Sequence, residues 1–197
     1  MIYIAIRMLV GDRLKYIGLI AGLTFASLLI TQQASIFAGF MDRTVAFMND
    51  TGQGDLWVMD PHNEFTDDRK PILDSALLRV RSVEGVEWAV PLYKGFIRTR
   101  LADRGVVTAR MVGLDDTTLM GGPPTMVHGR LSDLRQDKGI LIDDLERSTS
   151  LRLQKGIDAE GPRPMRVGDR IDINDREAVV VGTFHRSREF FWDPLIF

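Results

Sequence analysis

The sequence contains no cysteine and only three histidines, His62, His128 and His185. Without thiols, the chain can form no disulfide framework, no thiol nucleophile and no zinc–thiolate site. None of the three histidines has another histidine nearby at a metal-ligand spacing. We therefore expect no bound metal.

Lysine is also scarce, and none of the five lysines follows a glycine. A phosphate-binding ATPase loop needs a Gly-Lys-Ser/Thr sequence, so this chain does not bind ATP in that way. A Gly-x-Ser-x-Gly nucleophile motif is absent as well. Three carboxylate doublets are more typical of turns and helix caps than of acid–base pairs or cation ligands: Asp67-Asp68, Asp115-Asp116 and Asp143-Asp144. We expect no catalytic residues and no cofactor, so the chain is predicted not to be an enzyme.

Neither sign of charge is in large excess, since 25 basic and 27 acidic residues give a net charge of −2. This balance gives no electrostatic reason to bind nucleic acid. Charge is absent altogether from residues 16–41. As a helix this segment would be roughly 39 Å long, which exceeds a hydrocarbon core of about 30 Å. The sequence therefore predicts a transmembrane helix over residues 16–41.

Two other interpretations of this apolar segment remain open. A buried helix of a soluble protein could be as apolar, although soluble helices of this length normally carry a charged face. A cleaved signal peptide is the other alternative, but its best cleavage site, near residues 36–38, is poor.

The charges that flank the apolar segment predict its orientation. Arg7, Arg13 and Lys15 against Asp12 give the N-terminal flank a net charge of +2. By the positive-inside rule, the N-terminus is cytoplasmic and everything after about residue 42 lies outside. We therefore expect a cytoplasmic or interfacial segment (1–15), of which residues 1–11 can lie along the membrane surface, a membrane-proximal helical extension (42–54) and an extracytoplasmic domain (55–197).

Small and amide side chains share one face of the predicted transmembrane helix. At about 100° per residue, Gly18, Gly22, Ala26, Gln32 and Gln33 fall on the same side. The spacing Gly18-x-x-x-Gly22 permits close helix approach, and amides within a membrane favour protein partners. A Gly-x-x-x-Gly spacing alone also occurs by chance. Its coincidence with two glutamines predicts that this face packs against another protein helix.

Beyond the helix, strands and helices are mixed rather than strictly alternating, so the fold class is predicted to be α+β: one transmembrane helix and a mixed extracytoplasmic domain. Trp57, Trp88 and residues 190–192 favour packing rather than a ligand box. A small split β-α-β subdomain within residues 55–101 is left open. Residues 154–166, rich in glycine, proline and arginine, are predicted to form a connection. Helices are expected at 74–82, where Asp74 is the N-cap, and at 143–153, with a single helical turn at 115–119. A hairpin turn is expected at 103–105. The expected strands are 55–59, 86–91, 94–101, 106–113, 139–142, 170–173 and 177–184.

Short stretches distributed along nearly the whole chain resemble the permease subunits of ABC transporters of the MacB/FtsX type, and among them the DevC-like exporters. Each stretch is weak alone, but together they occur in the order of the family. The stretches are residues 7–16 leading into the helix with Gln32-Gln33, then 54–60, 83–91, 112–115, 129–130, 140–143, 167–169 and 181–182.

The resemblance implies a first membrane helix followed by a MacB-like periplasmic core domain, in the inner (plasma) membrane of a bacterium. It further implies an ABC ATPase on a separate chain, a second permease copy, a periplasmic adaptor protein and three more membrane helices. ATP hydrolysis would then drive the outer domain, with residues 16–50 as a stiff lever. This chain has only the first helix and the core domain and ends in an apolar stretch. We therefore expect it to be the front part of a longer permease, unable to transport alone.

A different class of function is also consistent with the sequence: a membrane-anchored extracytoplasmic sensor or adaptor domain, with at most one more spanning helix and a cytoplasmic signalling region. A secreted enzyme would require activity to survive removal of residues 1–48. The sequence does not distinguish among lipid, lipoprotein, glycolipid and hydrophobic drug as the exported substrate.

Overall fold

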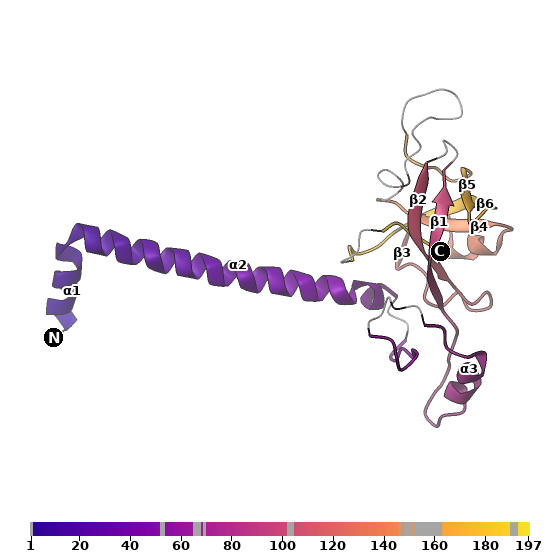
Figure 1. Cartoon of the computed structure of the whole chain (residues 1–197), viewed down its shortest axis with the longest axis horizontal. Coiled ribbons are helices and arrows are strands. Elements are labelled where there is room, and N and C mark those ends of the chain that lie inside the picture. The colour runs from indigo at the N-terminus through magenta and orange to yellow at the C-terminus, as the bar shows by residue number, and fades with distance from the viewer. Residues whose placement is uncertain are drawn as a thin grey trace. The chain divides into compact units, whose positions relative to one another are not determined.

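The computed structural model describes residues 2–51, 54–64, 68, 70–101, 105–145, 147, 151, 163–189 and 193–197. It divides into two compact units, Met1–Val45 and Ala46–Phe197, which are described separately below (Figure 1).

The first unit consists of two helices. Helix α1 spans Ile2–Gly11, and helix α2 starts at Arg13 and continues without interruption to Thr51, within the second unit. Asp12 separates the helices, and its carboxylate accepts a hydrogen bond from the backbone N–H of Lys15 at 3.3 Å, as an N-terminal capping residue does. Among the described residues, α2 is the one helix long and apolar enough to cross a membrane.

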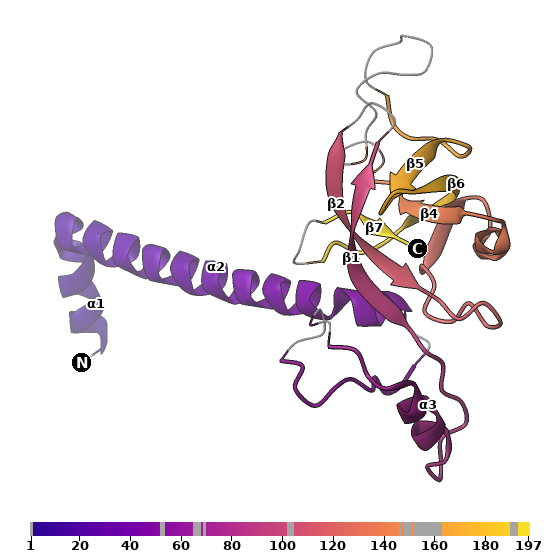
Figure 2. The ribbon, with the colours of Figure 1, turned by 45° about the vertical axis from the view of Figure 1, so that its right-hand side comes forward.

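The second unit is built on a seven-stranded mixed sheet (Figure 2). Strands β1 (Tyr93–Arg100) and β2 (Val106–Gly113) form an antiparallel hairpin paired along their full length. The spatial order is β3-β6-β4-β7-β2-β1-β5. Because β5 also pairs with β6, six strands close into a ring, to which β3 adds beside β6. The remaining strands are β3 (Thr125–His128), β4 (Gly139–Asp143), β5 (Arg170–Ile173), β6 (Arg176–His185) and β7 (Leu195–Ile196).

Alternating side chains of these strands form two separate cores. Successive strand residues point to opposite faces, so in β4 Ile140 and Ile142 belong to one cluster and Leu141 to the other. All six strands of the ring contribute to the first cluster, the inner core. The second cluster, the outer core, lies on the opposite face of the strands and contains Phe47, Val112, Leu141, Val181, Phe184, Leu195 and Phe197.

The structure corrects the prediction for residues 55–91. The segments 55–59 and 86–91 are not strands, because no described segment pairs with either. Helix α3 (Asp74–Arg81) lies between them as expected, but it has no buried residue and its N-cap is Leu73 rather than Asp74. Gly85, at φ +89°, follows this helix in a conformation that favours glycine. The β-α-β subdomain is therefore not formed by the described residues.

The other predictions fare better. The α+β fold class is confirmed, as are the strands at 94–101, 106–113, 139–142, 170–173 and 177–184, within one or two residues. The turn at 115–119 is confirmed by a hydrogen bond from the Leu119 N–H to the Asp115 carbonyl, at 2.8 Å. The predicted helix 143–153 is wrong at its start, because Asp143 ends β4 and residues 144–145 form a turn. Strands β3 and β7 and the 3-10 helix η1 (Leu131–Arg135) were not predicted. Residues 102–104, 148–150 and 152–162 lie outside the described residues.

Candidate helix-packing face and helix-end joint

The predicted packing face lies on α2, within the first unit. Gly18, Gly22, Ala26, Gln32 and Gln33 are all exposed. A Cβ atom added at either glycine would meet nothing within 4 Å. Within the described part of the chain, neither glutamine side chain forms a hydrogen bond, whereas the hydroxyls of Thr31 and Ser35 donate to backbone carbonyls one turn earlier. This face is therefore open and its amides are available, and its packing against another helix stays a prediction.

The last turn of α2 belongs to the second unit and is built into its outer core. Ala46, Phe47 and Thr51 are buried, and Phe47 is a member of the outer core. The ring of Phe47 lies 5.9 Å from that of Trp57, and the Lys94 ammonium lies 4.1 Å from the Phe47 ring centroid. Trp57 therefore packs in the outer core, as the sequence predicted, whereas Trp88 is 43% exposed and residues 190–192 lie outside the described residues.

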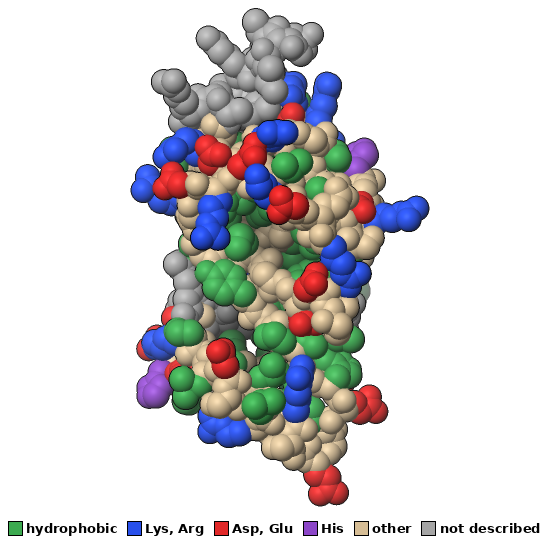
Figure 3. Space-filling view, turned by 90° about the vertical axis from the view of Figure 1, so that its right-hand side faces the viewer, with side chains coloured by type: hydrophobic (Ala, Val, Ile, Leu, Met, Phe, Trp, Pro, Cys, Tyr) green, Lys and Arg blue, Asp and Glu red, His purple; other side chains and the backbone are tan. Residues whose placement is uncertain are grey.

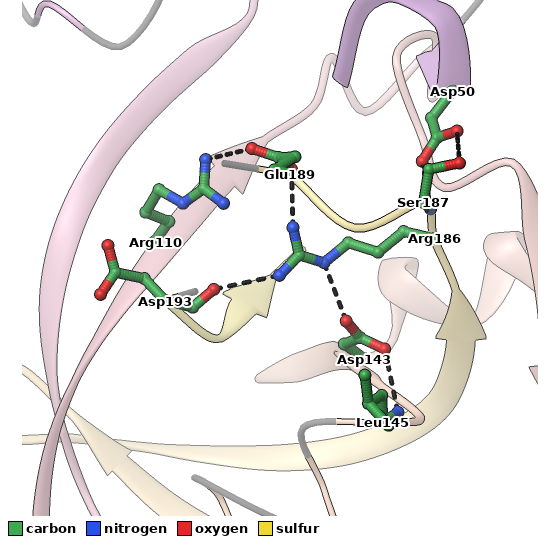
Figure 4. A network of polar contacts seen from close by, with 8 residues as sticks. All are labelled: Asp50, Arg110, Asp143, Leu145, Arg186, Ser187, Glu189 and Asp193. Atoms are coloured by element: carbon green, nitrogen blue, oxygen red, sulfur yellow. Dashed lines mark hydrogen bonds and ion pairs between the residues drawn. The ribbon is translucent and has the colours of Figure 1, made fainter. Parts of the chain in front are cut away.

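A pair of hydrogen bonds joins the end of α2 to the segment that follows β6. The backbone N–H of Ser187 donates to one Asp50 carboxylate oxygen at 2.7 Å, and its hydroxyl donates to the other at 2.8 Å (Figure 4). A carboxylate near a helix C-terminus is electrostatically unfavourable. These charge-assisted hydrogen bonds compensate for that position and hold the carboxylate at both oxygen atoms.

Arg186, next to Ser187, is the centre of a buried ionic network. Its Nε donates to Asp143 on β4 at 2.8 Å and its Nη1 donates to Glu189 at 2.6 Å. Its Nη2 donates to the carbonyl of Asp193 at 3.0 Å, just before β7. With three of its nitrogen atoms bound to three separate groups, the guanidinium has one well-defined position.

Arg110 of β2 completes the network. Its Nη1 pairs with the second carboxylate oxygen of Glu189, and its side chain is only 2% exposed. Asp143 uses its other oxygen to accept the backbone N–H of Leu145 at 3.0 Å. Two buried cations thus face two buried anions, and the network joins β2, β4 and the segment after β6. We name these four residues (Arg110, Asp143, Arg186 and Glu189) the buried network.

Little in the sequence indicates the buried network. Asp143 was expected in a turn or a helix cap, at the start of a helix. It accepts the backbone N–H of Leu145 in a turn and also binds Arg186. Arg110 alternates with the inner-core residues of β2, a pattern that predicts exposure to solvent. It is buried instead because the outer core covers this face of the sheet. The ion pairs join residues 43 and 79 positions apart, which no local motif reveals.

The other candidate groups have structural roles. Asp115 accepts hydrogen bonds from the N–H and hydroxyl of Thr118, as expected for a turn, and Asp68 pairs with Lys70 at 3.4 Å. Asp67 lies outside the described residues. His128 contacts the Thr183 hydroxyl at 2.9 Å. Among the residues that the structure describes, no group of three or more His, Cys, Asp or Glu could hold a metal ion.

Asp169 is a partly buried carboxylate with an altered pKa. Arg163 binds both of its oxygen atoms at 2.8 Å, and the Arg166 N–H donates to one of them at 2.8 Å. Burial alone would raise the pKa of Asp169, but these hydrogen bonds and the two arginine charges outweigh burial and lower the pKa. These hydrogen bonds to Asp169 stabilise the turn at 167–169, which precedes β5.

No protein-family model matches this chain, and no curated protein sequence matches it either. The solved structures that resemble part of this chain include the following three. The extracellular domain of the noncanonic ABC-type transporter YknZ from Gram-positive bacteria has a TM-score of 0.41 and 12% identity, over 64% of this chain and 60% of that chain. A domain assigned to a permease protein from Porphyromonas gingivalis has a TM-score of 0.39 and 19% identity, over 61% of this chain and 49% of that chain.

The periplasmic region of MacB from Actinobacillus actinomycetemcomitans has a TM-score of 0.38 and 15% identity, over 61% of this chain and 52% of that chain. The chain spans only 49–60% of the length of these domains, and no functional assignment follows from similarities this low.

Proposed function

We propose that this chain is part of the permease subunit of an ABC-type exporter and comprises a membrane helix and a periplasmic domain. The observation that carries the proposal is the continuity of α2. Its uncharged residues 16–41 continue into a last turn, at residues 46–51, that is packed in the outer core of a folded domain. The resemblance of short stretches in family order along nearly the whole sequence supports the same function.

In the proposed arrangement, residues 16–41 cross the inner membrane of a bacterium with the N-terminus in the cytoplasm. Residues 42–54 extend the helix out of the bilayer, and residues 55–197 form the periplasmic domain. An ATPase on a separate chain drives the membrane helices of two permease copies, with a periplasmic adaptor as a further partner. The outer domain then moves a lipid-like or hydrophobic substrate. The chain's own residues supply the anchor and the outer domain.

The proposed topology can be tested on this chain, because the absence of cysteine permits single-cysteine labelling. Ser132 in η1 and Leu14 at the start of α2 are both exposed. We expect a membrane-impermeant maleimide to label S132C from the periplasm of intact cells, and L14C only after the inner membrane is permeabilised. Labelling of L14C but not S132C, or recovery of a product that begins near residue 39, would contradict the proposed topology.

The transport role has a separate test. The complete reading frame should contain further apolar segments and should co-purify from membranes with a subunit that carries a phosphate-binding loop and hydrolyses ATP. A frame with at most one more spanning helix and a cytoplasmic signalling region would instead support a sensor or adaptor domain.

A further inference from the structure

We propose that the Asp50–Ser187 contact is a rotational lock, which fixes the angular position of the last turn of α2 on the domain through the buried network. This inference rests on the proposed function for its purpose, since a rotationally fixed joint matters when α2 conveys movement. Its physical basis lies entirely within the second unit, in contacts of residues 46–51 with the sheet and with the segment after β6.

The helix end is attached to the domain by two kinds of contact, which constrain different motions. Phe47 and Ala46 are held by apolar packing, which is non-directional and tolerates small rotations. Hydrogen bonds to a carboxylate are directional, and those from Ser187 bind both oxygen atoms at 2.7 and 2.8 Å. A side-chain atom about 5–6 Å from the helix axis moves roughly 3 Å when the helix rotates by about 30°, which is enough to break both bonds. The apolar contacts therefore hold the helix end in place, and Asp50 sets its angle.

The Ser187 side of the contact is held firmly. Its neighbour Arg186 is bound to Asp143 of β4, to Glu189 and to the Asp193 carbonyl before β7. Glu189 in turn binds Arg110 of β2. A change in the angle of Asp50 would therefore displace a segment anchored to both β2 and β4, rather than a loop that can yield (Figure 4).

The lock can be tested by distance measurement between spin labels on the full chain in nanodiscs, without any ATPase. The exposed residues Asn49, in the last turn of α2, and Ser132, in η1, are replaced by cysteine and labelled in an otherwise cysteine-free background. We expect one narrow distance distribution in this background. D50A removes both hydrogen bonds and should broaden the distribution about twofold, while the apolar contacts remain. S187A removes only the hydroxyl bond and keeps the backbone N–H donor, so it should broaden the distribution less.

Further variants separate a lock from a general loss of stability. D50N keeps one acceptor oxygen, so it should broaden the distribution less than D50A does. The D50A/S187A double variant should be no broader than D50A, because D50A already removes both hydrogen bonds. The matched controls D137N and S75A change exposed residues of the same types and should leave the distribution unchanged.

Distributions in D50A and S187A as narrow as those of the controls would overturn the lock. A lower thermal midpoint without broadening would overturn it as well, because the contact would then only stabilise the domain. The measurement uses no partner protein, so its failure leaves the exporter proposal standing. Conversely, failure to co-purify an ATPase would remove the exporter role while a broadened distribution still established the joint.

Discussion

The buried network joins two strand residues, Arg110 of β2 and Asp143 of β4, to two residues of the segment after β6, Arg186 and Glu189. Their charges balance, two positive and two negative, and Arg110, Glu189, Arg186 and Asp143 are between 2% and 8% exposed. A buried ion pair is seldom worth more than an apolar contact of the same size, but removal of one partner leaves an uncompensated charge. The network therefore contributes more to the relative positions of β2, β4 and the segment after β6 than to the net stability of the fold.

Replacement of Arg186, the central cation of the buried network, should show how far the two buried carboxylates depend on it. Arg186→Met leaves Asp143 and Glu189 buried without their shared partner, so we expect unfolding free energy to fall by about 3–5 kcal/mol. Chemical denaturation followed by tryptophan fluorescence measures the change. The control Arg176→Met alters an exposed arginine and should change stability by less than about 0.5 kcal/mol. A loss below about 1 kcal/mol in R186M would mean that water or rearranged side chains compensate for the missing charge.

Asp169 should make the folding stability of the chain vary with pH in the acidic range. Because its pKa is lowered in the folded chain, its contribution is complete above the ordinary value of 3.8 and is lost as pH falls through the lowered value. At neutral pH, Asp169→Asn should reduce unfolding free energy by about 1–2 kcal/mol, since it removes the charge that binds Arg163. Denaturation of the native sequence and D169N at a series of pH values, from neutral to strongly acidic, should show the two stabilities converging as the pH falls below 3.8. A difference that stays constant over this range would show that the charge of Asp169 is not its cause.

At the level of elements, the last turn of α2 is part of the domain core. Phe47 is 9% exposed and packs with Trp57, so Phe47→Ala should cost about 3 kcal/mol by leaving a cavity in the outer core. Trp57 fluorescence in detergent solution reports the loss directly. Phe37→Ala, earlier in the same helix and 64% exposed, is the matched control and should leave domain stability unchanged. Equal stability of F47A and F37A would mean that the helix end contributes little to the outer core.

The strands show what a sequence pattern can and cannot predict. Strands β1, β2, β5 and β6 have alternating side chains bounded by turns, and each was predicted closely. Segments 55–59 and 86–91 have similar β-propensity, but a strand also needs a partner, and no described residue supplies one. Strand β7 has only two residues, and β3 buries none of its four, so neither has an alternating buried face. Their existence depends on pairing with β6, β4 and β2, which is a property of the fold.

Several apolar side chains between α2 and β1 are exposed on the surface of the second unit. Leu56 is 86% exposed, Leu73 72% and Leu78 of α3 68%. The space-filling view in Figure 3 shows apolar side chains gathered in the middle and lower part of one face, with charged side chains densest in the upper part. The sequence predicted two strands here, 55–59 and 86–91, and a helix at 74–82. The exposure of these apolar side chains was not predicted, because burial depends on which other segments come to cover them.

At the scale of the whole molecule, the sequence predicted the division into an apolar helix and an α+β domain, because both depend on composition and local period. The closed ring was not predictable in this way. It requires β7, near the end of the chain, to lie between β2 and β4, and β5 to pair with both β1 and β6. The joint between the end of α2 and Ser187 is equally non-local, since its two residues are 137 positions apart.

The helix face containing Gly18, Gly22 and Ala26 should control how copies of the chain associate in the membrane. Gly22→Leu places a large side chain where close approach of another helix is expected, whereas Leu23→Ala changes the opposite face. A cysteine at Leu29, on the glycine face, reports proximity between copies through its yield of oxidative crosslinks in membranes. We expect G22L to lower the yield about fivefold, which corresponds to about 1 kcal/mol of helix association, and L23A to leave it nearly unchanged. Both glycines are open in the single chain, so G22L should not disturb α2 itself, and equal effects of the two substitutions would assign the contact to lipid rather than to protein.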